Sequence, residues 1–259
     1  MDEREVTFEV QGPAARLTIN REAARNALSV AVISGLMAGL DKAEADPAVR
    51  VVVLTGAGTR AFCAGGDLGG MQGDGFLSGH EGRRGYGALL LRLQGCAKPT
   101  VARLNGHAMA GGVGLVLASD FAIADSETQL GLPEIDRGLF PMMLLALLQR
   151  HLGRKRALEL LLLGEKVPAA RAAELGLINK VAEPGALDAE VSVWVEKLAG
   201  KSQAILKLGK RAFFTAEDLP LQQAVELLAA NLSLNVLAED AAEGVTSFLE
   251  KRKPNWKDR

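Results

Sequence analysis

Two glycine-containing segments, Cys63-Ala64-Gly65-Gly66-Asp67 and Ala110-Gly111-Gly112, are central to how this sequence folds. The first follows the apolar, β-branched run 51–54, and the second follows a predicted strand at 100–104 and opens a helical run. Glycine lets the backbone approach a ligand closely, and the first N–H groups of a helix have no partner within it. The two turns could direct two N–H donors at one developing oxyanion, or they could be ordinary tight turns of an α/β domain.

Alternating strands and helices are expected along the first half of the chain. Residues 6–10 and 16–19 each alternate polar and apolar side chains, and the Gly-Pro turn between them predicts a β-hairpin. A helix is expected from an N-cap at Ser29 to about Ala45, and another strand at 121–124. Because helices separate the later strands, parallel pairing through crossover connections is favoured, which indicates an α/β fold.

Two stretches of the chain differ in composition and pattern from the alternating strands and helices of the first half. Between Gly65 and Gly87 it contains ten glycines, which predicts a mobile loop next to a site. From about Pro141 onward, apolar residues recur at helical spacing with breaks at glycine or proline, which predicts an almost entirely helical second half. These helices could pack on the first half of the chain or on a neighbouring subunit.

Composition and charge exclude several classes of protein. The 259 residues are 48% hydrophobic and 24% charged, which is typical of a globular domain. The 30 basic and 31 acidic residues give a net charge of −1, so nothing points to nucleic acid or to an anionic membrane. Two cysteines and three separated histidines offer neither a disulfide scaffold nor the spacing of a zinc site. No apolar run approaches the roughly 20 residues of a membrane span, and the N-terminus lacks a signal-peptide pattern, so a cytoplasmic location is expected.

Glu134 is a candidate acid or base. It follows Gly131-Leu132-Pro133 and has apolar neighbours on both sides in the sequence. Such a carboxylate either faces solvent at a helix start or is partly buried with a raised pKa, as a general base requires. Cys63 and His107 adjoin the glycine segments, but no catalytic partner can be named for either, so a structural role is favoured for both.

The motifs, taken in order, carry a family likeness. The chain resembles the crotonase superfamily, the enoyl-CoA hydratase/isomerase group, along nearly its whole length. Seven segments match in register, at residues 20–28, 61–68, 98–112, 120, 132–141, 173–181 and 243–254. One such motif would be weak evidence for the family, but seven motifs in the same order are specific to it. The resemblance therefore favours a functional interpretation of both glycine segments and of Glu134.

The resemblance implies a fold, an assembly and a ligand. It implies an α/β, crotonase-like spiral of ββα units with a helical C-terminal trimerisation region. Residues 1–200 would form the spiral core with the acyl-CoA site, and residues 201–259 would form the helical region. The expected assembly is a homotrimer or a dimer of trimers. The ligand would be an acyl-CoA thioester, with coenzyme A present as part of the substrate and with no metal or redox cofactor.

The resemblance also implies roles for particular residues. The N–H groups of Gly66 and Gly111 would hold the thioester oxygen as it becomes an enolate oxygen, and Glu134 would be the acid/base. Two fixed donors in a dry site stabilise such charge by about 3 kcal/mol each. The residues that would contact the CoA part are Arg25, Ala27, Ala64 and Asp67, with Phe248 and Lys251 lent by a neighbouring subunit.

One position departs from the family pattern. Hydratases of the family carry a glutamate three residues after the second oxyanion glycine, where this chain has Gly114. Adding water needs a group to position and deprotonate it and a group to deliver a proton to carbon. Moving a double bond from C3–C4 to C2–C3 needs one base. We therefore expect enoyl-CoA isomerisation with Glu134 as the single acid/base, ahead of hydration assisted by another carboxylate such as Asp74 or Glu81.

Two further alternatives stay open, which are decarboxylation of an acyl-CoA and CoA binding without turnover. The absence of a side chain at Gly114 motivates the second of them. The dienoyl-CoA isomerase branch is disfavoured, because it carries an acidic residue eight positions after the glutamate, where this chain has Met142.

Overall fold

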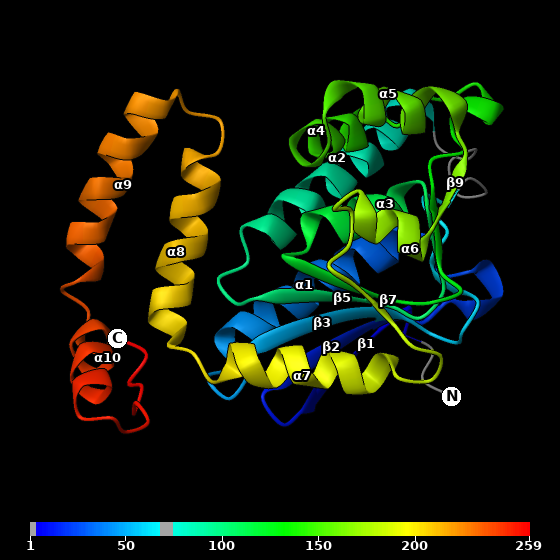
Figure 1. The fold of residues 1–259 in the computed structure, drawn as a ribbon. Helices are drawn as coiled ribbons and strands as arrows, with labels where there is room; N and C mark the ends of the chain where they lie inside the picture. Colours follow the sequence, from blue (N-terminus) through cyan, green and yellow to red (C-terminus); the bar gives the residue numbers. More distant parts are fainter. Residues whose placement is uncertain (1–3, 68–74) are drawn as a thin grey trace.

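The computed structural model describes residues 4–67 and 75–259, which form an α/β fold with two sheets (Figure 1). The larger sheet has the strand order β1-β2-β3-β5-β7-β10, at Val6–Gln11, Ala14–Ile19, Val51–Gly56, Thr100–Leu104, Phe121–Asp125 and Lys180–Ala182. The smaller sheet has the order β4-β6-β8-β9, at Ala61–Cys63, His107–Met109, Gln129–Gly131 and Lys166–Pro168. Only the β1–β2 and β8–β9 pairs are antiparallel among the paired strands of the described residues. The predicted α/β class, hairpin and parallel pairing are confirmed.

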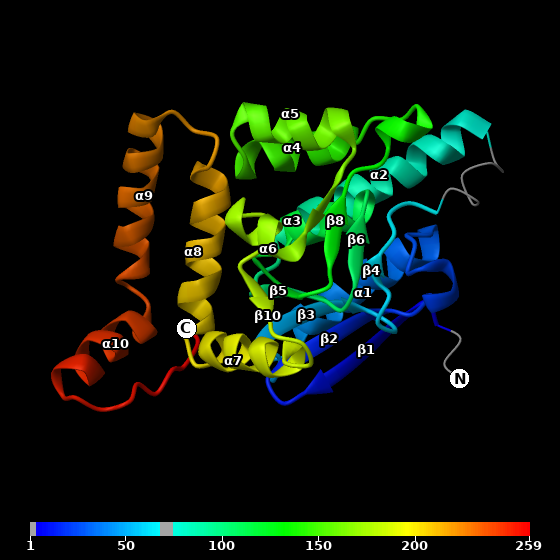
Figure 2. The same cartoon turned by 45° about the vertical axis from the view of Figure 1, so that its right-hand side comes forward.

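The helices cover both faces of the larger sheet and extend beyond it. They are α1 to α10, at Val30–Ala45, Gly75–Gln94, Gly111–Ala118, Met142–His151, Arg154–Leu163, Ala169–Glu174, Leu187–Ala199, Gln203–Ala216, Leu221–Asn235 and Glu239–Leu249, with short 3-10 turns η1 at Glu22–Ala24 and η3 at Ile135–Arg137. Helix α7 packs on one face of the sheet, and the main core lies on the other face beneath α1, α2 and α3 (Figure 2). None of the helices in the described part of the chain is long and apolar enough to cross a lipid bilayer.

Helix α1 begins as the sequence predicts. The hydroxyl of Ser29 accepts a hydrogen bond from the N–H of Val32 at 3.0 Å, which satisfies one of the unpaired donors of the first turn. Leu36 and Leu40 are buried one turn apart on the face of α1 that meets the sheet.

The prediction of a mobile loop between Gly65 and Gly87 is wrong for most of that interval. Residues from Gly75 onward form α2, and residues 65–67 pair with the segment at Leu28. Glycine disfavours a helix by about 1 kcal/mol per residue, but α2 packs against α1 and α3 through the buried side chains of Leu89 and Leu93. Tertiary burial therefore outweighs the local preference. The stretch 68–74 lies outside the described residues.

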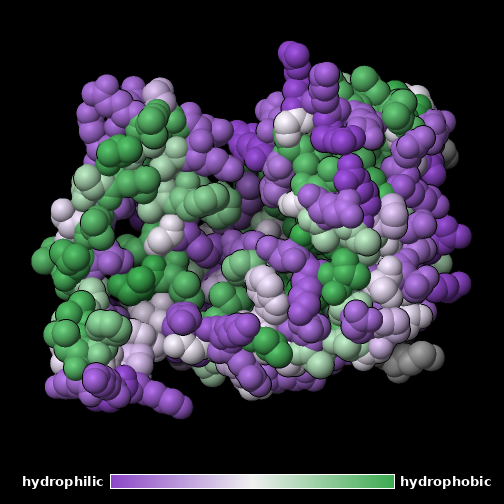
Figure 3. Space-filling model, in the orientation of Figure 1, coloured by the Kyte–Doolittle hydropathy of each residue, from purple (hydrophilic) through white to green (hydrophobic). Residues whose placement is uncertain are grey.

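Helices α8 to α10 form an arm beside the α/β body (Figures 1 and 2). Neither α8 nor α9 contains a buried residue in the single chain. The space-filling view shows apolar side chains gathered over this arm (Figure 3). Large exposed apolar residues on α8 to α10 and their connections are Leu208, Phe213, Leu221, Val225, Leu228, Leu232, Leu234, Val236, Leu237, Val245, Phe248 and Leu249. We call this set the apolar arm face.

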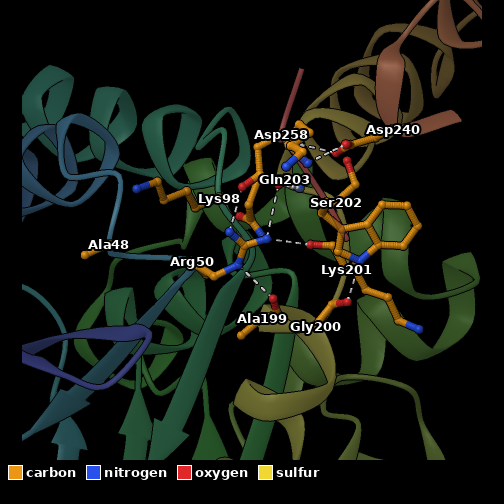
Figure 4. A network of polar contacts seen from close by, with 12 residues as sticks. Ala48, Arg50, Lys98, Ala199, Gly200, Lys201, Ser202, Gln203, Asp240 and Asp258 are labelled. Atoms are coloured by element: carbon orange, nitrogen blue, oxygen red, sulfur yellow. Dashed lines mark hydrogen bonds and ion pairs between the residues drawn. The ribbon is translucent and has the colours of Figure 1, made fainter. Parts of the chain in front are cut away.

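A polar network at Arg50 ties the end of the chain to the body (Figure 4). The guanidinium of Arg50 donates to the carbonyl oxygens of Ala199 and Lys201 at 2.7 and 2.9 Å. It also donates to both carboxylate oxygens of Asp258 at 2.7 and 3.1 Å, which lowers the pKa of that carboxyl. The buried carboxylate of Asp240 in α10 accepts from the N–H of Asp258 at 2.9 Å. One arginine thus joins the body, the start of the arm and the chain terminus.

Replacing Arg50 with alanine is expected to release this terminus. Because one change removes several charge-assisted hydrogen bonds, the expected loss of stability is about 2 kcal/mol. Hydrogen exchange should be faster in the variant than in the wild type at residues 252–259, with a smaller change in the strands of the larger sheet. Lys197→Ala, which removes an exposed cation of α7, is the matched control. Unchanged exchange at residues 252–259 in the Arg50 variant would contradict the proposed anchoring.

Candidate active site

The first glycine segment lies beside an N-terminal loop. Segments 25–28 and 64–67 are joined by three backbone hydrogen bonds, from Ala64 N–H to Arg25 O (3.0 Å), from Leu28 N–H to Gly65 O (2.8 Å) and from Asp67 N–H to Leu28 O (3.1 Å). The pairing brings together five of the predicted site residues, Arg25, Ala27, Ala64, Gly66 and Asp67. The carboxylate of Asp67 forms an ion pair with Arg21 at 2.9 Å, so its charge is balanced within the protein.

The N-terminal loop is held in an unusual backbone conformation. Arg25 and Asn26 have φ of 53° and 57°, a region that side chains other than glycine and asparagine seldom adopt. The buried amide of Asn26 fixes it by donating to the carbonyl oxygens of Ala57 and Ala61 at 3.0 and 2.7 Å. Its oxygen accepts from the N–H of Arg21 at 3.1 Å. No role is expected for Asn26 from the sequence. The one signal that could have pointed to it is that asparagine tolerates a positive φ better than most residues.

The second glycine segment packs directly on the first, because strands β4 and β6 pair in parallel. A Cβ atom added at Gly65 would lie 2.6 Å from Cβ of Ala110 and 3.0 Å from the nitrogen of Gly111. A Cβ added at Gly112 would overlap the carbonyl oxygen of Cys63. Gly65 also has φ of 93°. The close approach of the two backbones therefore requires glycine at these positions.

Two N–H groups at this junction have no acceptor among the described residues. Gly111 is the first residue of α3, so its N–H lies outside the helical hydrogen-bond pattern. The bridge at Gly66 uses the N–H groups of Leu28 and Asp67 instead, and since N–H groups alternate in direction along an extended segment, that of Gly66 points the other way. Ala110, which precedes Gly111, has φ of 50°, and strained backbone of this kind clusters at functional sites.

Glu134 follows β8, the strand next to β6 in the smaller sheet. The N–H of Ala110 donates to the carbonyl oxygen of Gly131 at 2.8 Å, which links the second glycine segment to the chain leading to Glu134. The Oε2 atom of Glu134 is buried and has no hydrogen-bond partner among the described residues. Burial raises the pKa of Glu134 above its ordinary 4.5, against the opposing effects of a backbone N–H and of Arg137. The sequence left open whether Glu134 faces solvent or is partly buried with a raised pKa, and the structure supports partial burial.

Tyr86, the one tyrosine of the sequence, lies over Gly114. Its hydroxyl donates to the carbonyl oxygen of Gly111 at 2.7 Å. A Cβ added at Gly114 would overlap that hydroxyl. Burial raises the pKa of Tyr86 well above its ordinary value, and the negative charge of the Glu134 carboxylate raises it further. No role is expected for Tyr86 from the sequence, because it lies in the glycine-rich interval that predicts a loop.

Comparison with known proteins identifies the family of this chain. The family model described as Enoyl-CoA hydratase/isomerase matches residues 9–259. This chain belongs to the enoyl-CoA hydratase/isomerase family. It is 36% identical over 249 residues to a putative enoyl-CoA hydratase of Thermus thermophilus, covering 95% of this chain and 98% of the relative. It is 34% identical over 256 residues to crotonyl-CoA hydratase of Syntrophomonas wolfei, covering 97% of each chain.

Solved structures confirm the crotonase fold. A crystal structure of an enoyl-CoA hydratase from Mycobacterium smegmatis matches with a TM-score of 0.93 and 35% identity, over 98% of this chain and 99% of that one. An enoyl-CoA hydratase from Bacillus anthracis matches with a TM-score of 0.93 and 29% identity, over 98% of this chain and all of that one. The expected fold class is confirmed over nearly the full length.

Among the described residues, the carboxylates near the glycine segments are Asp67, which is paired with Arg21, and Glu134, whose Oε2 atom has no partner. Of the two candidates for a second catalytic carboxylate, Glu81 is exposed on α2 and Asp74 lies outside the described residues. No group of three or more histidine, cysteine, aspartate or glutamate side chains in residues 4–67 and 75–259 is arranged to hold a metal ion. Glu134, the backbone N–H groups of Gly66 and Gly111, and the hydroxyl of Tyr86 are the polar groups that the described residues bring to this part of the fold.

Cys63 and His107 lie close to the junction in different environments. Cys63 is fully buried and burial raises its pKa to about 12, so its thiol stays protonated and unreactive at neutral pH. His107 is exposed, and its Nδ1 accepts from the N–H of Gln129 at 3.2 Å across the smaller sheet. Both observations support the structural interpretation.

Phe248 and Lys251 are not brought to this site within one chain. Figure 2 shows α10 at the opposite end of the molecule from β4 and β6. Phe248 is 79% exposed, and Lys251 follows the helix with φ of 56°. Within one chain, these two residues therefore lie apart from the predicted site residues of the paired loops.

Proposed function

We propose that this chain is an acyl-CoA enzyme that hydrates 2-enoyl-CoA thioesters to 3-hydroxyacyl-CoA. The observation that carries the proposal is the buried Oε2 atom of Glu134, which has no partner among the described residues and follows β8, the strand paired with β6 next to the second glycine segment. Relatives named as hydratases favour addition of water over the isomerisation that the sequence analysis expected.

The backbone N–H groups of Gly66 and Gly111 would bind the thioester oxygen. Attack at C3 places negative charge on that oxygen, because the thioester becomes an enolate. Two rigid donors with no other acceptor stabilise this charge without reorganisation, by about 3 kcal/mol each. The paired loops and the start of α3 fix both donors before substrate arrives.

Glu134 would carry the proton from water to carbon. As the water oxygen bonds to C3, the carboxylate accepts one water proton and the C2–C3 π electrons move to the thioester oxygen. The enolate then collapses as the protonated Glu134 delivers that proton to C2. One proton is taken and one returned, so a single carboxylate balances the reaction. A raised pKa suits this exchange, since the group must be both base and acid near neutral pH.

The CoA part of the substrate would lie along the paired loops. The exposed side chain of Arg25 stands next to Ala64 and suits a phosphate, while Ala27 and Asp67 shape the adjoining backbone. We infer that Phe248 and Lys251 approach the CoA from a second copy, because they are exposed and remote from the site in their own chain.

We further propose that copies of the chain cover the apolar arm face, in a trimer or a dimer of trimers. Twelve large exposed apolar side chains on three helices and their connections are more than a monomer ordinarily leaves uncovered. Leu232→Glu with Val225→Glu on α9 is expected to give species smaller than the wild-type assembly, whose mass should be at least three times 27.3 kDa. Sedimentation velocity measures this, with Val10→Glu on β1 as the control. A wild-type monomer at micromolar concentration would contradict the proposal.

Isomerisation of 3-enoyl-CoA is the second candidate, and the missing side chain at Gly114 favours it. Absorbance of the conjugated enoyl-thioester separates the two reactions. A 2-enoyl-CoA losing absorbance, with a mass gain of one water, supports hydration. A 3-enoyl-CoA gaining absorbance without change in mass supports isomerisation instead. No change with either substrate over several chain lengths would contradict both and leave decarboxylation or CoA binding without turnover.

A further inference from the structure

We propose that Tyr86 takes the place of the second acidic side chain: its hydroxyl oxygen, held over Gly114, orients the water that Glu134 activates. This role rests on the proposed hydration. It is motivated by one coincidence in the structure, namely that the phenolic oxygen occupies the space into which a side chain at residue 114 would extend.

The position of the hydroxyl is fixed from two directions. The hydroxyl donates a hydrogen bond to the carbonyl oxygen of Gly111 at 2.7 Å. The ring lies against the same residue, because a Cβ added at Gly111 would be 3.4 Å from both Cζ and Oη of Tyr86. Gly111 also supplies one of the two free N–H groups. Tyr86 is therefore tied to the same backbone that would bind the substrate oxygen.

The hydrogen bonding of Tyr86 sets what it can offer to a ligand. A phenol has one proton, and that proton is committed to the Gly111 carbonyl, so the remaining capacity of the oxygen is that of an acceptor. Burial and the neighbouring charge of Glu134 keep the phenol neutral through and beyond neutral pH. A neutral acceptor can hold a water O–H without competing for its proton.

A water molecule between Tyr86 and Glu134 would then donate both of its hydrogen bonds to defined acceptors. One O–H donates to the phenolic oxygen and stays on the water, and the other donates to the carboxylate and is transferred as the oxygen bonds to C3. Tyr86 neither gains nor loses a proton. Its contribution is orientation, and misplacement of a reacting group by about 1 Å can cost on the order of 10²-fold in rate.

Tyr86→Phe separates this role from a structural one. We expect the kcat for hydration of a 2-enoyl-CoA to fall about 50-fold with little change in KM. Exchange of the C2 proton of a saturated acyl-CoA with deuterium oxide needs Glu134 and the two N–H groups but no attacking water. That exchange should change by less than about 3-fold. An equal loss in both reactions, or no loss in either, would overturn the proposal.

A second variant tests the position of the oxygen. After the phenolic oxygen, the atoms nearest to a Cβ added at residue 114 belong to Leu144 and Leu90, at 3.2 and 3.3 Å. Gly114→Ser combined with Tyr86→Phe returns a hydroxyl to the same space from the opposite side, and we expect it to recover at least about 5-fold in hydration. If the double variant recovers no hydration while its C2-proton exchange is unchanged, the assigned position of the water-orienting hydroxyl is wrong. A wild-type chain that exchanges the C2 proton but hydrates no enoyl-CoA would instead overturn the proposed function, and this role with it.

Discussion

Replacing Glu134 with glutamine is expected to lower kcat about 10³-fold or more while leaving the affinity for acyl-CoA within about 3-fold. The amide keeps the size of the side chain but can neither take a proton from water nor deliver one to carbon, and general acid–base groups contribute up to about 10⁴-fold. Binding energy comes mainly from the CoA part, which the change does not touch. Steady-state kinetics together with calorimetric titration of a saturated acyl-CoA measure the two quantities. Glu127→Gln, on an exposed turn, is the control.

The same variant should gain stability at neutral pH. Burial raises the pKa of Glu134 in the folded state, so the folded protein favours the protonated form more than the unfolded chain does. The stability associated with that proton is complete below the ordinary pKa of 4.5 and is lost as pH rises through the folded pKa. The Tm of Glu134→Gln should therefore exceed that of the wild type at pH 7, and the difference should shrink toward pH 4. A Tm below wild type at pH 7, or turnover close to wild type, would contradict the assignment of Glu134.

The pH dependence of catalysis follows from the same carboxylate. In the proposed hydration the attack requires its base form, so kcat/KM should fall as pH is lowered through a pKa above 4.5. Tyr86 stays neutral over this range and adds no second ionisation near neutral pH.

Gly114→Ala is expected to destabilise the fold by about 2 kcal/mol, although alanine is the better helix former. In an open helix the exchange would stabilise by up to about 1 kcal/mol. At this position the added Cβ overlaps the hydroxyl of Tyr86 in a close-packed core, so the ring must move and break its hydrogen bond to Gly111. Chemical denaturation measures the loss. Gly82→Ala in α2, where an added Cβ meets nothing within 4 Å, is the control and should be neutral or slightly stabilising.

Removing the obstructing oxygen should rescue this variant. Tyr86→Phe alone costs about 1 kcal/mol for one hydrogen bond. Combined with Gly114→Ala it should cost less than the sum of the single changes, by a coupling of about 1 to 2 kcal/mol, because the same oxygen causes both losses. Additive effects would show that Tyr86 does not occupy the space over Gly114.

Local sequence determined the parts of this protein that depend on near neighbours in the chain. Each of the two glycine segments follows a predicted strand that the structure confirms. Ser29 caps α1 through a donor three residues away. Glu134 could be singled out because apolar neighbours around a carboxylate are visible in sequence, and the ordered motifs identified the family over nearly the whole chain.

Tertiary structure alone decided what rests on contacts between distant segments. Residues of the glycine-rich interval became helix α2 because its leucines are buried against α1 and α3, a gain that no local propensity reports. Arg50 and Asp258 are 208 positions apart, and nothing in either segment indicates the other. The hydroxyl of Tyr86 fills the space left by Gly114, 28 positions later in the chain, because two packed helices bring them together. The missing side chain was visible in the sequence, and the group that occupies its place became visible only once the helices were packed.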